Sequence, residues 1–268
     1  PRRAPAAPRR TGRRTRPGYD VPAMRGGASG RGTGRAVRRP ARRRGGADPA
    51  GRPIAVHPVT PERWDDLVRL FGERGAYGGC WCMFFRLPRP AFDRGARDGG
   101  AGNRAALRSF VADGRIPGLL AYAGDEPVGW VSVAPREEFG RVQRSAFGRA
   151  SPPGSGVWAI VCFFVHRRHR GGGVARALLR AAVAHARAGG ARAVEAYPVD
   201  PAVHRTDAAG AYVGVVSMFA AEGFREVARP YPHRPLMRRS FRTPTARPGA
   251  ESRGPRGGRG RAGPGSEA

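Results

Sequence analysis

The chain has 268 residues and a formal net charge of +29 at pH 7, with 49 basic residues, all of them arginine, against 20 acidic ones. No apolar run approaches the roughly 18 residues of a membrane-spanning helix, and no signal-peptide core is present, which argues against a membrane or secreted protein. Three cysteines without a secretory signal predict reduced thiols in a cytoplasmic protein.

The composition predicts one folded domain over residues 51–242 between two disordered tails. Residues 1–50 carry a net charge of +13 and show almost no apolar periodicity, so they cannot form a packed core. Residues 243–268 are also rich in arginine, glycine and proline. Two interpretations of the tails stay open. The first is electrostatic attraction to nucleic acid, the ribosome or an acidic membrane, and the second is a compositional bias or an over-extended reading frame. The near absence of aromatic residues for base stacking favours the second.

From residue 51 onward, strand and helix patterns alternate. Residues 54–59 (IAVHPV) predict a first strand. A threonine and a proline then open a helix that runs to about residue 74, and residues 103–113 predict a second amphipathic helix. Residues 118–133 predict a hairpin with its turn at 124–127.

The most informative segment is a buried strand that leads into a basic, glycine-rich turn and then a helix. The strand covers residues 157–165 (VWAIVCFFV), and the turn HRRHRGGG precedes an alanine- and leucine-rich helix. A helix N-terminus offers free N–H groups and a positive dipole end to an anion. Gly171, Gly172 and Gly173 let the backbone approach it closely, and Arg170 adds charge-assisted hydrogen bonds. The segment predicts a site for a phosphorylated small molecule.

Spacing excludes two familiar phosphate-binding loops. A P-loop requires a lysine, and the chain contains none. The dinucleotide fingerprint requires a last glycine where Arg176 stands. Two more strands are expected around residues 193–197 and 236–241, with a short helix over 217–222 that leads into the segment GFREV at 223–227.

The loop Arg170-Gly171-Gly172-Gly173-Val174-Ala175 resembles the Arg/Gln-x-x-Gly-x-Gly/Ala loop of the GCN5-related N-acetyltransferases (GNAT). The hairpin LLAYAGDEPVGWVSV is similar to the central hairpin of that family, and CWCM, VGWVSVAPRE and VCFFV together resemble one bacterial branch. The resemblance covers residues 51–242. It implies an α/β fold with a mixed, mostly antiparallel central sheet, helices on both faces and a splay between the fourth and fifth strands.

The same resemblance implies transfer of an acetyl group from acetyl-CoA to a primary amine by direct attack in a ternary complex, without a metal, in a monomer or homodimer. The backbone of Phe163 and Val165 would bind the pantetheine arm. The pyrophosphate would lie against Arg170, Gly171, Gly172, Gly173, Val174 and Ala175, and His166, Arg167 and Arg168 would attract the nucleotide phosphates.

The proton donor departs from the family pattern. Phe219 stands where many members carry a tyrosine, and Tyr212 stands at a second common position, where members have an asparagine. Tyr212 and Ser217 are the nearest hydroxyls and are therefore the candidate general acids. Unassisted departure of the thiolate is the alternative, because a thiol is already fairly acidic.

Glu195 is the first candidate for the general base, because it interrupts the apolar fifth strand. The alternative is a carboxylate on the solvent side of the strand or one paired with Arg192. Asp200, just past the strand, is the reserve candidate.

Cys80, Trp81 and Cys82 lie between the first two helices, a segment that lines the acceptor pocket in proteins of this resemblance. No second Cys/His pair accompanies them, so the spacing does not indicate zinc. Simple core packing is the alternative, since a free cysteine behaves as a small hydrophobe.

Three functions remain open at this point. The first is an N-acetyltransferase acting on a small-molecule or protein amine. The second is a non-catalytic acyl-CoA-binding regulator, which Phe219 motivates. The third is a protein acetyltransferase directed to RNA or the ribosome by the arginine-rich tail. Residues 51–242 carry a net charge of +13, which mildly favours a neutral or anionic amine as the acceptor.

Overall fold

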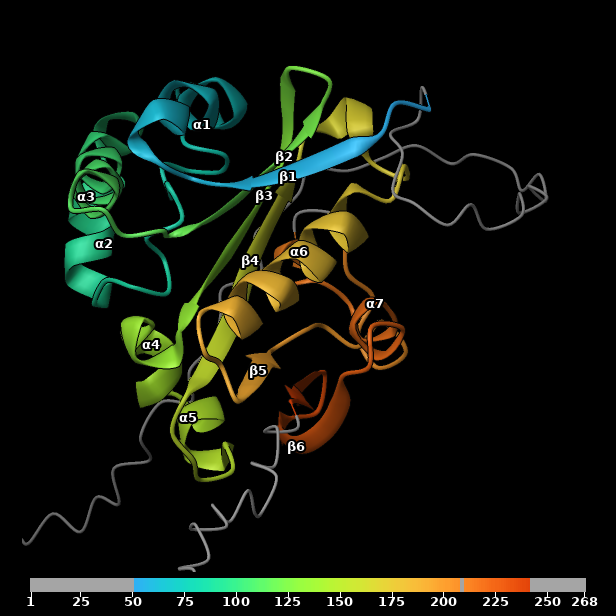
Figure 1. The fold of residues 1–268 in the computed structure, drawn as a ribbon. Coiled ribbons are helices and arrows are strands. Elements are labelled where there is room, and N and C mark those ends of the chain that lie inside the picture. The colour runs from blue at the N-terminus through green and yellow to red at the C-terminus, as the bar shows by residue number, and fades with distance from the viewer. Residues whose placement is uncertain (1–50, 208–209, 242–268) are drawn as a thin grey trace, which may run out of the picture.

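The computed structural model describes residues 51–207 and 210–241, so both predicted tails lie outside the described residues. The described part forms a seven-stranded sheet in the order β1-β2-β3-β4-β5-β7-β6. All neighbouring strands pair antiparallel except β4 and β5, which are parallel. This confirms the mixed, mostly antiparallel sheet (Figure 1). The strands are β1 (Ile54–Pro58), β2 (Gly118–Ala123), β3 (Glu126–Pro135), β4 (Val157–Val165), β5 (Ala193–Ala196), β6 (Arg225–Tyr231) and β7 (Arg234–Ser240).

Helices cover both faces of the sheet, as expected. They are α1 (Trp64–Phe71), α2 (Arg89–Gly95), α3 (Ala101–Ala112), α4 (Gly140–Arg144), α5 (Ala146–Ala150), α6 (Val174–Ala188) and α7 (Val216–Ala220). The long helix α6 crosses one face, while α1 and α3 lie together away from it (Figure 1). Alternate residues of β4 contribute to the cores on the two faces of the sheet. Phe163 packs in the α6 core, whereas Phe164 packs against the core that includes α1 and α3.

The first predicted helix is shorter than expected. A 3₁₀ turn at Pro61–Arg63 precedes α1, and the helix ends at Gly72, whose φ of 65° lies in the left-handed region that favours glycine. The short helices α4 and α5, and α2, were not predicted, because five to seven residues carry too little periodicity to read from sequence. No helix among residues 51–207 and 210–241 is long and apolar enough to cross a membrane.

The parallel pair β4–β5 separates partway along its length. Hydrogen-bonded pairing runs from Val157 to Ile160 on β4, opposite Ala193–Ala196. The last five residues of β4, 161–165, extend beyond the end of β5. Residues 161–165, the part of β4 nearest the glycine-rich turn, are therefore not paired with β5.

Candidate active site

The turn after β4 has the backbone that the sequence analysis requires. Gly171 and Gly173 have φ values of 81° and 83°, and Gly173 is the N-cap residue of the 15-residue helix α6. A Cβ added at either glycine would meet nothing within 4 Å. Glycine is therefore needed here for its backbone conformation, and the space beside the turn is open. The first N–H groups of α6 have no intrahelical acceptor and carry the positive end of the helix dipole.

Arg170 ties this turn to the end of β4. Its Nε donates a hydrogen bond to the Val165 carbonyl oxygen at 3.1 Å, while its side chain stays exposed. Phe163, two residues earlier, packs against Phe219 with 6.0 Å between ring centroids. The residues predicted for the phosphate loop thus follow the unpaired part of β4 directly along the chain, and their role in binding stays a prediction.

Two histidines flank the start of the turn. His169 Nε2 lies 3.3 Å from Glu126 Oε1, and Glu126 also pairs with Arg52 at 3.4 Å. The His166 N–H donates to the Val128 carbonyl at 2.9 Å. Burial, together with the neighbouring His169 and Arg168, lowers the pKa of His166 below its usual value, so His166 is neutral at pH 7. Of the residues expected to attract nucleotide phosphates, His166 therefore adds no charge.

Glu195 lies inside a network of buried and partly buried polar groups. Its side chain is fully buried, and Oε1 accepts a hydrogen bond from Ser151 at 2.6 Å. Tyr197 and Arg136 donate to Oε2 at 3.3 and 3.4 Å, and Arg238 pairs with the carboxylate at 3.6 Å. A general base needs a free lone pair within reach of its proton. The arrangement therefore argues against the base role expected for Glu195, because two guanidiniums and two hydroxyls already engage the carboxylate.

The reserve candidate, Asp200, is also engaged. Its Oδ2 pairs with Arg229 at 3.0 Å, and its Oδ1 accepts the Ala202 N–H at 3.2 Å. Asp200 thus acts as a local cap for the turn that follows β5.

Tyr212 is the candidate acid that lies beside β4. It sits in a 3₁₀ turn, Gly210–Val213, that contacts β4, with its ring 6.3 Å from that of Phe85. Burial raises the pKa of the Tyr212 phenol above its usual value; the Arg234 guanidinium opposes this effect, and the Cys162 and Cys80 thiols add to it. The phenol is therefore protonated at neutral pH and able to donate.

The other candidate acid, Ser217, is exposed on α7. Within residues 51–207 and 210–241, no hydrogen bond joins its side chain to Tyr212 or Glu195. Phe219, on the same helix, is fully buried in the α6 core. Of the two candidate acids, Tyr212 is thus the one whose element has a described contact with β4.

Three thiols gather on the α1/α3 side of β4. Cys82 Sγ lies 3.1 Å from Cys162 Sγ and accepts a hydrogen bond from Trp130 Nε1 at 2.9 Å. Burial raises the pKa of Cys82, and the hydrogen bond with Cys82 together with burial raises that of Cys80. Cys80 and Cys82 are therefore protonated and poor nucleophiles.

The segment predicted to line an acceptor pocket is mostly core. Trp81 is 1% exposed and Cys82 is buried, whereas Cys80 is partly exposed. Among the described residues, no group of three or more His, Cys, Asp or Glu side chains could hold a metal ion. The partners of Glu195 were missed in the sequence analysis, because no local pattern relates residues 136, 151 and 238 to position 195.

The chain is similar to one known protein family and to several solved structures. The model of the Acetyltransferase (GNAT) family matches residues 81–212. The chain is similar to the PaiA N-acetyltransferase of Thermoplasma acidophilum in complex with coenzyme A, at 12% identity and a TM-score of 0.41, over 70% of this chain and 99% of that chain. It is also similar to a histone acetyltransferase HPA2-related protein of Corynebacterium glutamicum, at 20% identity and a TM-score of 0.43, over 72% and 99%. No curated protein sequence matches the chain.

Proposed function

Residues 81–212 belong to the GNAT family of acetyltransferases, and on this premise we propose that the protein transfers an acetyl group from acetyl-CoA to a primary amine in a ternary complex. The observation that carries the proposal is the turn between β4 and α6. Its two glycines in the left-handed region, the open space beside them and the free helix N-terminus form a cradle for a pyrophosphate.

The unpaired end of β4 suits the rest of the coenzyme. An extended chain bearing amide groups can pair with a strand edge in the manner of an added strand. Phe163 and Val165 lie where β5 no longer pairs with β4, so their backbone groups are proposed to bind the pantetheine arm. Arg170 is proposed to bind a phosphate oxygen while Arg170 Nε keeps the turn against β4.

The proposed chemistry uses a neutral amine and a protonated tyrosine. The amine nitrogen attacks the thioester carbonyl carbon, the carbon–sulfur bond breaks, and the sulfur leaves with the electron pair. Tyr212 is proposed to donate its proton to this thiolate, since its phenol is protonated and lies beside β4. The proton lost from the amine passes to solvent. Ser217, which is exposed on α7, stays the alternative donor, directly or through water.

A second candidate function is binding of an acyl-CoA without catalysis. The observation behind it is Phe219, which is fully buried where many family members have a tyrosine. The two functions differ in one product, because only the transferase releases coenzyme A in the presence of an amine.

The test has two stages. The full chain is titrated calorimetrically with acetyl-CoA, with coenzyme A and NADP as controls. Binding of both CoA species but not NADP supports the cradle, and absence of CoA binding refutes the proposal. Release of free thiol is then measured with a panel of small amines and peptides. Binding without release for every amine would favour the regulator.

A further inference from the structure

The three thiols on the α1/α3 side of β4 take no part in the proposed transfer reaction, yet two of them lie very close together. Cys82 Sγ is 3.1 Å from Cys162 Sγ, although 80 residues separate the two along the chain. A disulfide bond is about 2.05 Å long, so these sulfur atoms need to approach by only about 1 Å to be joined. Cys80 also contacts Cys82, but its Sγ donates to the Gly75 carbonyl oxygen at 3.2 Å. The geometry therefore favours Cys82 and Cys162 as a pair.

The central sheet fixes the positions of both sulfur atoms. Cys162 lies on β4, in register with Ser132 of β3. Trp130, two residues earlier on β3, donates its Nε1–H to Cys82 Sγ at 2.9 Å. Since Trp130 is fully buried, this contact does not depend on an exposed side chain. The same two strands thus hold both members of the pair.

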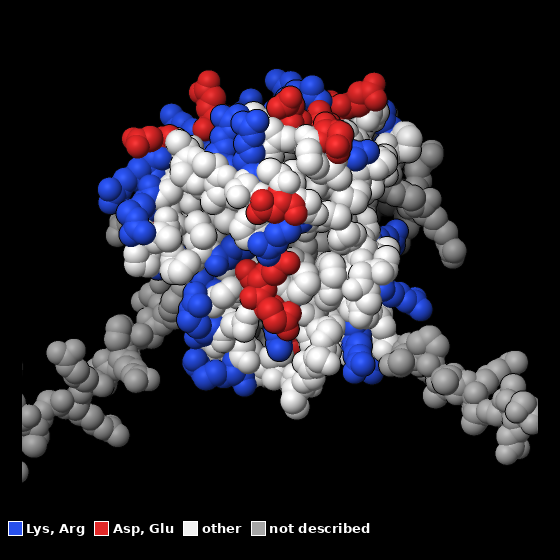
Figure 2. Space-filling view, turned by 60° about the vertical axis from the view of Figure 1, so that its left-hand side comes forward, with Lys and Arg blue, Asp and Glu red and all other residues white. Residues whose placement is uncertain are grey.

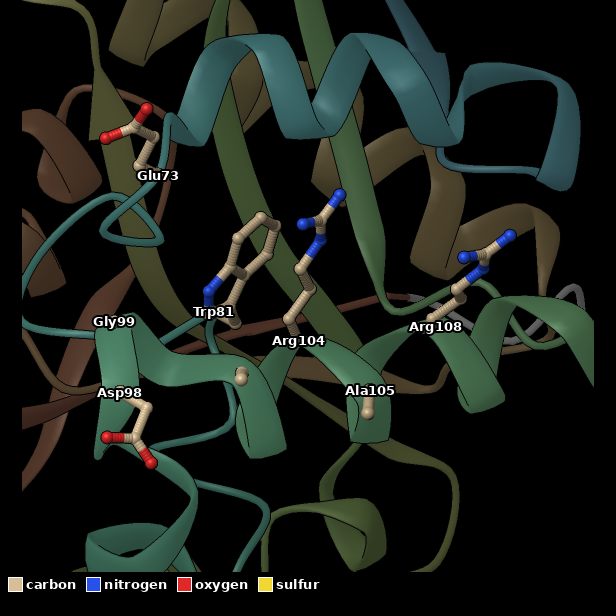
Figure 3. Close-up of a pocket in the computed structure, with 8 residues that line it drawn as sticks. Glu73, Trp81, Asp98, Gly99, Arg104, Ala105 and Arg108 are labelled. Atoms are coloured by element: carbon tan, nitrogen blue, oxygen red, sulfur yellow. The ribbon is translucent and has the colours of Figure 1, made fainter.

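The turn that carries Cys82 has a strained backbone. Trp81 and Cys82 have φ values of 40° and 49°, in the left-handed region that large side chains rarely adopt. The Trp81 ring stacks on Trp64 of α1, with 6.3 Å between ring centroids, and lies 5.2 Å from the Arg104 guanidinium of α3. Trp81 also borders a surface cavity of about 430 Å³ between these helices (Figure 3). Such strain persists only where the surroundings impose it, so the fold holds Cys82 against Cys162 at a cost.

The two thiols differ in their exposure. Cys82 is buried, whereas Cys162 is partly exposed, so an oxidant reaches Cys162 first. Acidic and basic side chains lie interspersed with uncharged surface on the face turned forward in Figure 2, which gives a charged oxidant no advantage there. A peroxide is small and uncharged, and it reacts with a partly exposed thiol without a charged binding site.

We propose that Cys82 and Cys162 form a reversible disulfide when the protein meets a peroxide. In the first step the Cys162 sulfur attacks one peroxide oxygen, the O–O bond breaks, and the released hydroxide takes the thiol proton and leaves as water. In the second step the Cys82 sulfur attacks the sulfur of the Cys162 sulfenic acid, the S–O bond breaks, and the hydroxide leaves with the Cys82 proton as a second water. The two thiols lose two electrons, which reduce the peroxide.

The environment of Cys82 suits the second step. Burial raises the pKa of Cys82, so its thiol stays protonated and does not compete with Cys162 for the oxidant. Its S–H donates towards Cys162 Sγ, which places the proton beside the departing hydroxide. The Trp130 N–H supports the negative charge that develops on the Cys82 sulfur during the attack. Because the two sulfur atoms are already in contact, the second step is intramolecular.

The test uses the reduced full chain. It is incubated with hydrogen peroxide, and the remaining thiols are then blocked with iodoacetamide. We expect the number of free thiols to fall from three to one, in a product with the mass of a single chain. Trypsin should release peptides 75–86 and 150–167 as a linked pair, and dithiothreitol should restore all three thiols. No acetyl-CoA or amine is present, so a failure of the proposed transfer reaction leaves this result unaffected.

A second digestion and two serine variants identify the partner of Cys162. Chymotrypsin cuts after Trp81 and so separates Cys80 from Cys82, and we expect the peptide that contains Cys82 to carry the link. Cys80→Ser should still form the link. Cys82→Ser should form none and should leave a sulfenic acid on Cys162 that reacts with dimedone. Thermal unfolding of the reduced variants confirms that they fold.

Three results would overturn the proposal. The first is that peroxide leaves the thiols of the unaltered chain intact. The second is that it converts Cys162 to a sulfinic acid without any link. The third is that Cys80→Ser loses the link while Cys82→Ser keeps it, because Cys80 would then be the partner of Cys162.

Discussion

Substitution of Gly173 tests whether the turn before α6 binds the coenzyme. With φ at 83°, an alanine here enters the left-handed region at a cost of about 1–2 kcal/mol, although its Cβ would clash with nothing. The turn can relieve this strain only by rotating its amides away from the phosphate position. The affinity of Gly173→Ala for acetyl-CoA should therefore fall about 5- to 30-fold. The affinity of Gly173→Asn for acetyl-CoA should fall less, because asparagine tolerates the left-handed conformation.

Gly114 provides a matched control. It has a φ of 73°, an added Cβ would also meet nothing within 4 Å, and it lies between α3 and β2. Gly114→Ala should lose similar stability in chemical denaturation but bind acetyl-CoA as the unaltered chain does. The affinities of Gly173→Ala, Gly173→Asn and Gly114→Ala are measured by calorimetric titration with acetyl-CoA. If Gly173→Ala and Gly114→Ala bind with equal, unaltered affinity, the turn is not the phosphate site.

Three further predictions concern single side chains. Arg170→Gln should weaken acetyl-CoA binding about tenfold or more, the value of a charge-assisted hydrogen bond, and titration at rising salt should show a smaller salt dependence. Tyr212→Phe should lower kcat about 100-fold at unchanged acetyl-CoA affinity; an unaltered kcat would show that the thiolate leaves unassisted. Glu195→Gln should leave the pH–rate profile in place but destabilise the fold by about 3–5 kcal/mol in denaturant unfolding, since two partly buried guanidiniums lose their fully buried counter-charge. A shifted profile in a stable Glu195→Gln protein would restore Glu195 as the base.

Local patterns were sufficient to predict most of the strands and the turn before α6, whereas the mixed, mostly antiparallel sheet was implied by the resemblance to a known family. The run VWAIVCFFV and the three glycines after it predicted β4 and the start of α6, because strand periodicity and glycine conformation are properties of adjacent residues. Local patterns did not predict the hydrogen-bond and ion-pair partners of Glu195. Its interruption of an apolar strand was visible, but its partners Arg136, Ser151 and Arg238 come from three other segments. Only tertiary structure distinguishes a paired carboxylate from a free one.

Trp81 is a second residue whose environment local sequence patterns did not determine. The sequence placed it with Cys80 and Cys82 in an acceptor pocket, and the alternative was core packing. In the structure its inner side meets Phe71 in the core, while it also lines the cavity between α1 and α3. A backbone φ of 40° at this residue, outside the usual range for a large side chain, accompanies this position. No pattern of residue types predicts such a backbone conformation.

The opening between β4 and β5 has an identifiable cause in the chain itself. β5 ends at Ala196, and Pro198 follows two residues later without a backbone N–H, so it cannot continue a hydrogen-bonded ladder with β4. Arg234 on β7 donates from Nε and Nη2 to the Tyr197 carbonyl at 3.0 and 2.8 Å. That carbonyl is thereby held by β7 where the strand leaves the sheet. The unpaired edge of β4, where the pantetheine arm is proposed to bind, thus depends on two residues. Pro198 has no N–H to donate to β4, and the buried Arg234 guanidinium holds the Tyr197 carbonyl against β7.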